Sequence, residues 1–508
     1  MPANAEDIEQ QRYDLLVVGG GVNGAGIARD AAGRGLKVLL CEKGDLAGAT
    51  SSASSKLIHG GLRYLEYYEF RLVREALLER EVLLDCAPHI IWPLRFVLPH
   101  DKHLRPTWMI RAGLFLYDHL ARRRSLPGSA GVDFRRDAAG QPMKPEFHRG
   151  FVYSDCWVDD ARLVVLLAMD AAERGARVLT RTECVAAERG GEGWIARLRD
   201  RQGKAYRVRA GAMVNAAGPW VGNVLAQVAG RNDAKPPRLV KGSHIVVPRL
   251  YEGEHAYILQ NRDRRIVFVI PYEGRFSLIG TTDVPFDGDP SRVSISPEET
   301  AYLCEVVGRW FRRAPSPADV TWSYAGVRPL FDDQSDNPSA VTRDYVLKLE
   351  DAAGQAPLLS IYGGKITTFR RLAEHALEKL APHLPAMGPA WTSRGLLPGG
   401  DLGGKGFADF LAEQRRRYGF LPAATAERMA HAYGSRIERV LDGAHGPADL
   451  GRDLGAGLSE REAQYLIAHE WAVTAEDILW RRSKLGLHGP SDMKSTLSAY
   501  LAQPGAAA

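Results

Sequence analysis

The segment Tyr13-Asp-Leu-Leu-Val-Val-Gly-Gly-Gly-Val-Asn-Gly24 decides the fold of this 508-residue chain. Its apolar, β-forming start, residues 13–18, predicts a buried parallel strand. The glycines follow at once, and residues 25–34 predict a helix rich in small side chains. Because strand, glycine-rich turn and helix come in this order, the segment is typical of a unit that binds a dinucleotide.

Gly19, Gly21 and Gly24 have the spacing Gly-x-Gly-x-x-Gly. In this spacing the first glycine turns the chain, the second admits a pyrophosphate, and the third lets the helix lie close to the strand. A second predicted strand, residues 36–42, ends in Glu42, 18 residues after Gly24. That separation is near the roughly 20 residues expected for a carboxylate that binds ribose hydroxyls. An acid here argues against a 2′-phosphate and therefore against NADP.

Two further segments favour FAD over NAD. Residues 50–66 bring many hydroxyls and small residues together with His59 and Arg63, so we expect this backbone to lie against a cofactor. Residues 212–220 are a strand-like run that passes through Ala-Ala-Gly, a common closing element of the sheet in FAD enzymes. The predicted cofactor-binding residues are Gly19, Gly21, Asn23, Gly24, Glu42, Ser51, Ser52, Ser55, Ala217, Gly218, Gly364 and Thr367.

Composition excludes several other classes of protein. The five cysteines are scattered and include no Cys-x-x-Cys pair, which argues against disulfides and against a metal site. The start of the chain lacks the pattern of a signal peptide, and no run reaches the ~18 apolar residues of a transmembrane helix. A net charge of +5 is mild for this length and does not indicate a nucleic-acid partner. We therefore expect a cytoplasmic protein that is soluble or peripheral to a membrane.

Residues 102–124 are basic at both ends and apolar in the middle. They contain six Lys or Arg residues and one acid, and the aromatic run 108–117 lies between the basic ends. A helix of this kind suits the headgroup region of an anionic membrane. It would equally suit a helix buried in a second domain with its arginines in solvent, and the residues alone leave both interpretations open.

The whole pattern predicts an α/β protein of three domains. A Rossmann-like FAD-binding domain is expected from residues 12–90, 150–235 and 320–385. Short β-type runs at 241–247, 256–260, 265–272 and 277–282 predict an antiparallel sheet. That sheet would form the floor of a substrate pocket, in a cap domain of residues 91–149 and 236–319. Residues 400–508 predict an all-α domain in which Ser459 and Thr474 begin helices with capping patterns.

Several cations beside glycines or at strand ends point to an anionic substrate. They are Arg63, Arg328, Arg343 and Lys365. A single arginine is usually part of a surface ion pair, but arginine also binds phosphate or carboxylate oxygens bidentately. Oxidation of an alcohol also needs a base for the hydroxyl proton, and His59 and His244 are the candidates.

Taken together, the motifs resemble those of the FAD-dependent sn-glycerol-3-phosphate dehydrogenases of aerobic bacteria. The resemblance runs from about residue 12 to the C-terminal helices. One departure is Phe369, where the family motif usually has tyrosine, and we interpret this side chain as packing. The matching segments are residues 18–35, 51–66, 241–248, 280–283, 326–329 and 363–373.

The resemblance implies oxidation of glycerol 3-phosphate to dihydroxyacetone phosphate, with electrons passing from the flavin to membrane quinone. It implies a homodimer attached to the inner face of the cytoplasmic membrane, which favours the membrane interpretation of residues 102–124. It places His59 near the flavin, and we expect His59, His244, Arg328 and Lys365 to be catalytic. The implied substrate contacts are Arg63, Tyr64, His244, Thr281, Arg328, Arg343 and Lys365.

Three alternatives stay open at this point. One is an oxidase of the same family that reduces dioxygen instead of quinone. Another is an amino-acid or amine oxidase of the same fold, in which the arginines would bind a carboxylate. The third is an FAD-bearing protein that binds nucleic acid, suggested only by the basic pI.

Overall fold

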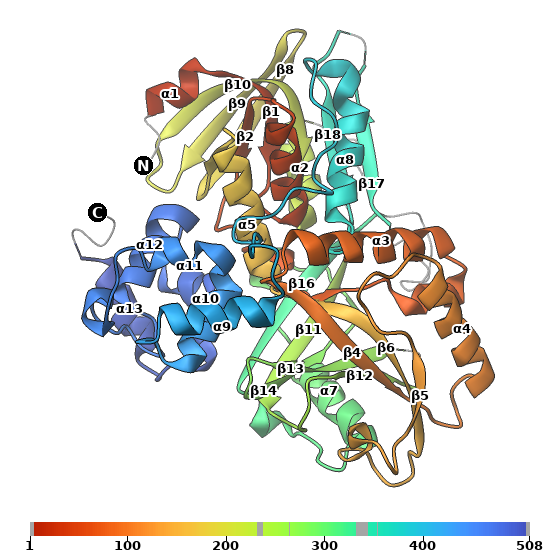
Figure 1. The fold of residues 1–508 in the computed structure, drawn as a ribbon. Helices are drawn as coiled ribbons and strands as arrows, with labels where there is room; N and C mark the ends of the chain where they lie inside the picture. Colours follow the sequence, from red (N-terminus) through yellow and green to blue (C-terminus); the bar gives the residue numbers. More distant parts are fainter. Residues whose placement is uncertain (1–4, 231–236, 264, 332–343, 353, 504–508) are drawn as a thin grey trace.

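The computed structural model describes residues 5–230, 237–263, 265–331, 344–352 and 354–503. Two β-sheets lie one above the other in Figure 1, and the C-terminal helices (blue) lie to one side of them. The helices that accompany the sheets are α1 Ala5–Gln10, α2 Val22–Gly33, α3 Phe70–Cys86, α4 Thr107–His119, α5 Asp160–Glu173, α6 Val221–Asn223, α7 Pro297–Trp310 and α8 Phe369–Leu380.

The first sheet is the predicted dinucleotide-binding sheet, with strand order β17-β18-β10-β1-β2-β7. Its centre is parallel, because β1 pairs in parallel with β10 and β2, and β10 pairs in parallel with β18. The hairpin of β8 and β9 extends β10 in the antiparallel sense. The strands are β1 Arg12–Val18, β2 Val38–Cys41, β7 Arg177–Leu179, β8 Thr182–Gly190, β9 Gly193–Asp200, β10 Ala205–Asn215, β17 Val346–Glu350 and β18 Leu358–Tyr362.

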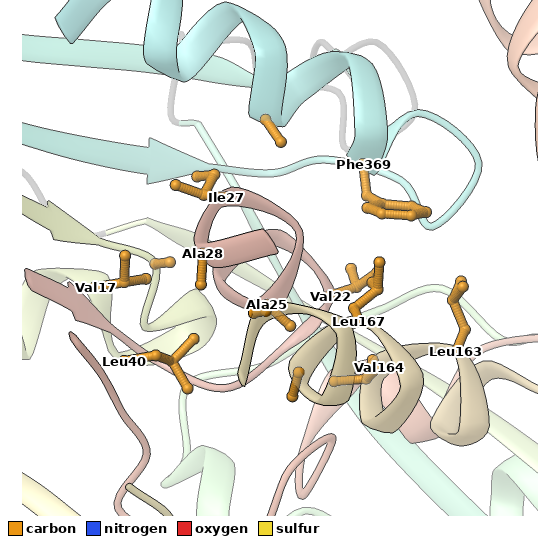
Figure 2. Close-up of a cluster of buried hydrophobic side chains, with 14 of the residues drawn as sticks. Val17, Val22, Ala25, Ile27, Ala28, Leu40, Leu163, Val164, Leu167 and Phe369 are labelled. Atoms are coloured by element: carbon orange, nitrogen blue, oxygen red, sulfur yellow. The ribbon is translucent and has the colours of Figure 1, made fainter. Parts of the chain in front are cut away.

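Helix α2 lies at the centre of the core beside this sheet. Figure 2 shows its small side chains between β1, α5 and α8, where Ala25 and Ala28 are fully buried. A Cβ on Gly26 would lie 2.8 Å from the ring of Phe369, so this phenylalanine packs directly on α2. Small residues are therefore needed along α2 because helices approach it closely from two sides.

The second sheet has strand order β15-β11-β14-β13-β12-β4-β6-β3, with β16 on β11 and β5 on β6. The four predicted β-runs become β11 to β14, and all of their mutual pairs are antiparallel, as predicted. The strands are β3 Leu57–Ile58, β4 Ile91–Pro99, β5 Ala130–Asp133, β6 Arg149–Val158, β11 Arg238–Pro248, β12 Ala256–Gln260, β13 Ile266–Tyr272, β14 Phe276–Gly280, β15 Val284–Pro285 and β16 Trp322–Leu330.

Three of these strands differ from the predicted domain boundaries. Strands β3, β6 (from its second residue) and β16 lie in ranges expected to belong to the FAD-binding domain, but they form hydrogen bonds with β6, β4 and β11 of the second sheet. The chain crosses between the two sheets at the ends of these strands. A strand's own residues do not show which sheet supplies its partner, so the sequence could not place these crossings.

Helix α4 is formed by the basic, aromatic segment. Leu114 and Tyr117 are buried beneath it, whereas Trp108 and Phe115 are 68% and 58% exposed. The helix is therefore a surface helix with exposed aromatic side chains, and not one enclosed in a domain. None of the helices within the described ranges is long and apolar enough to cross a membrane.

The C-terminal helices have a hydrophobic core of their own. Both predicted helix starts are capped: the Ser459 hydroxyl accepts the Glu462 N–H, and Thr474 and Asp477 exchange side chain-to-backbone hydrogen bonds. These caps end the preceding loops and fix where each helix begins. The helices are α9 Phe407–Arg417, α10 Ala423–Tyr433, α11 Ile437–Val440, α12 Glu460–Glu470 and α13 Met493–Leu501, and the helical segment Asp477–Arg482 follows the Thr474 cap.

Candidate functional site

A cavity of about 820 Å³ lies at the carboxyl ends of β1, β2, β10 and β18. Ligands of open α/β sheets bind at this end of the strands. Most of the predicted cofactor residues line the cavity: Gly19, Gly21, Asn23, Glu42, Ser51, Ser52, Ala217, Gly218 and Gly364. Three of the predicted substrate residues, Tyr64, Arg328 and Lys365, line the same cavity.

Each of the three motif glycines is required for a different structural reason. Gly19 has φ +115°, and a Cβ there would lie 2.5 Å from the Ala216 carbonyl oxygen. A Cβ on Gly24 would lie 1.9 Å from the Gly19 carbonyl oxygen, so this position closes the contact between β1 and α2. A Cβ on Gly21 would meet only the Ser51 hydroxyl, at 3.1 Å. The N-terminus of α2 therefore faces the cavity with bare backbone, which fits a pyrophosphate.

Glu42 follows β2 and lines the cavity with a largely buried carboxylate. Its two oxygens accept the N–H groups of Gly20 and Gly44, each at 2.7 Å. Burial raises the pKa of this carboxyl group, although the two hydrogen bonds lower it. Each oxygen keeps a lone pair that a ribose hydroxyl can use. The glycine turn and this acid together fit the diphosphate and ribose of FAD.

Residues 50–66 are held tightly, as their composition predicts. The Ser51 hydroxyl accepts the Val22 N–H at 3.0 Å, and the Thr50 hydroxyl donates to the Val327 carbonyl at 2.6 Å. Buried Lys56 forms an ion pair with buried Asp160 at 2.7 Å. The segment therefore joins α2, α5 and the second sheet at the edge of the cavity.

Three predicted cofactor residues, Gly24, Ser55 and Thr367, are not among the residues that line the cavity. Gly24 faces the glycine turn. The Ser55 hydroxyl lies 2.9 Å from Nε2 of His244, and the Thr367 hydroxyl accepts the backbone N–H of His59 at 3.2 Å. Ser55 and Thr367 therefore hold the two candidate bases in place.

Both candidate bases are neutral near physiological pH. His244 is buried, and its ring stacks on Tyr324 with centroids 4.8 Å apart. Burial, with the charges of Lys56 and Arg328, lowers the pKa of His244 well below its usual value. Burial and the charges of Lys365 and Arg80 lower the pKa of His59 to about 4. Neutral imidazole can accept a proton, so neither candidate is eliminated.

Arg328 is held at the cavity by two polar contacts. One of its terminal nitrogens lies 2.8 Å from the Asp283 carboxylate, and the other donates to the Thr282 carbonyl at 3.0 Å. The Thr281 hydroxyl lies 3.5 Å from the same guanidinium. The role of Asp283 was missed, although it belongs to the quoted motif at residues 280–283, because a carboxylate beside an anion site is not expected from sequence.

The other predicted substrate residues differ in position. Lys365 Nζ lies 3.8 Å from the centroid of the Tyr64 ring, which brings these two residues together at the cavity. Arg63 follows the left-handed Gly61 in the turn Leu62–Tyr67 and is not among the lining residues. Arg343 lies outside the described residues.

Four further lining residues come from the C-terminal helical region and could not be predicted from the sequence. They come from a region separated from the glycine motif by more than half of the chain, and no motif marks them. They are Glu476, Trp480, Arg481 and Lys484.

A family model described as FAD dependent oxidoreductase matches residues 14–370. The chain belongs to this family. A second model, the C-terminal domain of alpha-glycerophosphate oxidase, matches residues 390–501. The oxidoreductase binds FAD, as the glycine turn, Glu42 and residues 50–66 predict, and its fold of an FAD domain followed by a helical domain is confirmed.

Three curated relatives align with this FAD dependent oxidoreductase over almost its full length. The glycerol-3-phosphate dehydrogenase of Pseudomonas aeruginosa is 59% identical, covering 96% of this chain and 95% of that protein. The aerobic glycerol-3-phosphate dehydrogenase of Escherichia coli is 55% identical, covering 96% and 97%. The D-erythritol 1-phosphate dehydrogenase of Brucella abortus is 53% identical, covering 94% and 96%. These matches confirm the resemblance drawn from the motifs.

A solved structure has the same architecture. The glycerol-3-phosphate dehydrogenase of Bacillus halodurans, complexed with FAD, superposes on the oxidoreductase with a TM-score of 0.76. It is 26% identical, and the alignment covers 98% of this chain and 92% of that chain.

Proposed function

We propose that the protein oxidises sn-glycerol 3-phosphate to dihydroxyacetone phosphate, with hydride passing to FAD and electrons passing on to a membrane quinone. The observation that carries this proposal is the position of Arg328 and Lys365 on the cavity that also holds the glycine turn and Glu42. Cations at this place bring a phosphorylated alcohol next to the cofactor. The high identity to two glycerol-3-phosphate dehydrogenases supports the same substrate.

The residues of this chain divide the work of the reaction. FAD, when bound, supplies the ring that accepts hydride. Arg328 binds the phosphate, and its bonds to Asp283 and Thr282 keep the guanidinium in one orientation. Arg343 would be the second phosphate ligand, and Lys365 and Arg63 would contact the oxygens of the glycerol end. Holding the substrate at two ends fixes the reacting carbon near the cofactor, as hydride transfer requires.

His59 or His244 takes the hydroxyl proton as hydride leaves the carbon. A proton taken at Nε2 of His244 would be shared with the Ser55 hydroxyl, 2.9 Å away. The Thr367 hydroxyl holds His59 through the backbone N–H of this histidine, and the charge of Lys365 lowers the pKa of its ring.

The second candidate substrate is D-erythritol 1-phosphate. It is also a polyol phosphate, so the same cations would bind it. The observation in its favour is the 53% identity to the Brucella enzyme, which is close to the identities of the glycerol-3-phosphate dehydrogenases.

Anaerobic titration of the purified, FAD-loaded protein tests the proposal. Glycerol 3-phosphate should bleach the flavin absorbance at lower concentration and faster than D-erythritol 1-phosphate does. The reverse order would make the erythritol phosphate the substrate, and bleaching only by amino acids would favour the amino-acid oxidase. If the protein forms stoichiometric hydrogen peroxide during turnover in air, its electron acceptor is dioxygen and not quinone.

The pH dependence of flavin reduction tests the histidines. Because the pKa of His59 is lowered to about 4 and that of His244 is also low, the base stays neutral as the pH falls through the usual histidine range. At saturating substrate, stopped-flow reduction should therefore be almost flat between about pH 5.5 and 8. The rate falls only where the ring gains a proton. Half-loss of the rate near pH 6.5, the ordinary value for histidine, would contradict this expectation.

Single substitutions identify which histidine is the base. Replacing the base with glutamine should slow flavin reduction about 10²–10⁴-fold. Replacing the other histidine should have a smaller effect. Equal, small effects in His59→Gln and His244→Gln would mean that neither ring takes the proton.

Helix α4 is the proposed contact with an anionic membrane, at whose surface the protein would reduce the quinone. Exposed aromatic side chains lie on α4 and on the turn Leu62–Tyr67 beside it, and Tyr68 is 79% exposed. Arg105, in the loop just before α4, forms an ion pair with Glu66 of this turn at 3.2 Å. Peripheral attachment at the inner face of the cytoplasmic membrane, and the homodimer implied by the family resemblance, belong to the same proposal.

Cosedimentation with anionic vesicles tests this contact. Changing Trp108 and Phe115 together to serine should lower the bound fraction about fivefold, because the exposed apolar area of α4 is lost. Serine at Leu396 and Val473, which are 44% and 45% exposed on other surfaces, is the matched control and should leave binding unchanged. Undiminished binding of the α4 variant would remove α4 from the membrane contact.

A further inference from the structure

The C-terminal helical domain forms part of the wall of the FAD cavity. The segment Asp477–Arg482 follows α12, and its Trp480 and Arg481 line the cavity. The Trp480 ring stacks on Trp322 of β16, with ring centroids 4.2 Å apart and planes inclined by 16°. The segment is therefore packed against the second sheet at the edge of the cavity.

Asp45 connects this segment to the loop that follows Glu42. One Asp45 oxygen accepts from Nε of Arg481 and from Arg482, each at 2.5 Å, and the other accepts from Arg482 at 2.8 Å. The side chains of Asp45 and Arg482 are 4% and 0% exposed. Moving the segment away would take Arg481 and Arg482 from buried Asp45 together, so the connection resists separation.

Asp477 holds Arg481 from the opposite side. It accepts a second Arg481 hydrogen bond at 2.6 Å and also pairs with Arg181, which precedes β8. Burial alone would raise the pKa of Asp477, but hydrogen bonds from Val473 and Thr474 and the two arginines lower it to about 2. Asp477 therefore stays ionised and keeps Arg481 directed toward Asp45.

The loop that carries Asp45 also fixes the two main FAD contacts. The Gly44 N–H donates to Glu42 at 2.7 Å, and the Ala47 N–H donates to the Gly20 carbonyl at 3.1 Å. The Gly44 carbonyl accepts the backbone N–H of Arg181 at 2.8 Å. A shift of Asp45 would therefore move both the ribose-binding acid and the glycine turn.

We propose that the C-terminal domain is a working part of the FAD site, in which Arg481 and Arg482 hold the Asp45 loop in the geometry that binds the cofactor. Arg481 is a positioning residue for Glu42 and the glycine turn, and it completes the cavity wall. Loosening the C-terminal domain would release FAD. This inference rests on FAD as the cofactor and does not depend on which polyol phosphate is oxidised.

Titration of full-length apoprotein with FAD, followed by flavin fluorescence, tests the proposal. Arg481→Gln should raise the FAD dissociation constant about tenfold or more. The matched control is Arg428→Gln, because Arg428 pairs with buried Glu462 at 2.6 Å entirely within the C-terminal helices. This control should stay within about twofold of the unmodified protein.

Two results would overturn the proposal. One is an Arg481→Gln dissociation constant within about twofold of the unmodified value. The other is an equal rise in Arg428→Gln, which would report general loosening of the C-terminal helices. Melting of each apoprotein shows whether it is folded. If Arg481→Gln is unfolded, Arg481→Lys is tested in its place. This variant keeps the positive charge and should raise the FAD dissociation constant about threefold. An unchanged FAD dissociation constant would overturn the proposal.

Discussion

Replacing Gly24 with alanine is expected to reduce the yield of folded, FAD-bound protein to about a tenth or less. The new Cβ would lie 1.9 Å from the Gly19 carbonyl oxygen. The Cβ is fixed directly to the backbone of α2 and the oxygen belongs to the backbone after β1, so no rotation of a side chain relieves the overlap. Flavin absorbance per mole of purified protein and the melting temperature measure the loss. Normal yield and normal melting would contradict the close contact of β1 and α2.

Alanine at Gly21 is the informative comparison. Its Cβ would meet only the Ser51 hydroxyl, and Gly21 has an ordinary φ of −82°. The variant should therefore fold, with an almost unchanged apoprotein melting temperature. Its FAD dissociation constant should rise about tenfold or more, because the methyl group enters the cavity where the pyrophosphate is expected. Undiminished FAD affinity would place the diphosphate away from the N-terminus of α2.

Replacing Arg328 with alanine is expected to raise KM for glycerol 3-phosphate at least about a hundredfold. Each charge-assisted hydrogen bond to a phosphate contributes about 1.5–3 kcal/mol, and a bidentate arginine makes two of them. The loss of kcat/KM for unphosphorylated glycerol should be small, because glycerol has no anion to bind. Steady-state assays with both alcohols and an artificial electron acceptor measure this difference.

The control for Arg328 is an arginine of similar surroundings outside the cavity. Arg309 pairs with Asp101 at 2.6 Å and is 28% exposed, close to the 32% of Arg328. Arg309→Ala should leave KM for glycerol 3-phosphate within about twofold of the unmodified value. Equal losses on glycerol and glycerol 3-phosphate in Arg328→Ala would show that the arginine supports the fold and does not bind phosphate.

The dinucleotide-binding half of the fold could be predicted because its determinants are local. The run 13–18 becomes the buried strand β1, and the glycines that follow it have the conformations and contacts that their spacing predicts. Glu42 lies at the cavity because a strand of fixed length ends there. Even the place of Phe369 follows from the small residues of α2, on which its ring packs.

The contacts of the predicted substrate-binding cations could not be derived without the tertiary structure. Arg328 and Lys365 were found from their glycine-flanked settings, and both line the cavity. The pairing of Arg328 with Asp283 depends on β11 lying between β15 and β16, which is a matter of strand order. The hydrogen bonds of Ser55 to the His244 ring and of Thr367 to the His59 backbone likewise join segments that are far apart in the sequence.

The sequence by itself therefore determined the class of fold, the cofactor and the cations of the site, since these depend on residues close together in the chain. Only the tertiary structure decided which sheet β3, β6 and β16 join, which predicted residues line the cavity, and that the C-terminal helices reach the loop of Asp45. The ion pairs of Asp45 with Arg481 and Arg482 join residues more than 430 positions apart. Nothing local encodes such a contact, because it forms only when separately folded helices and sheets pack together.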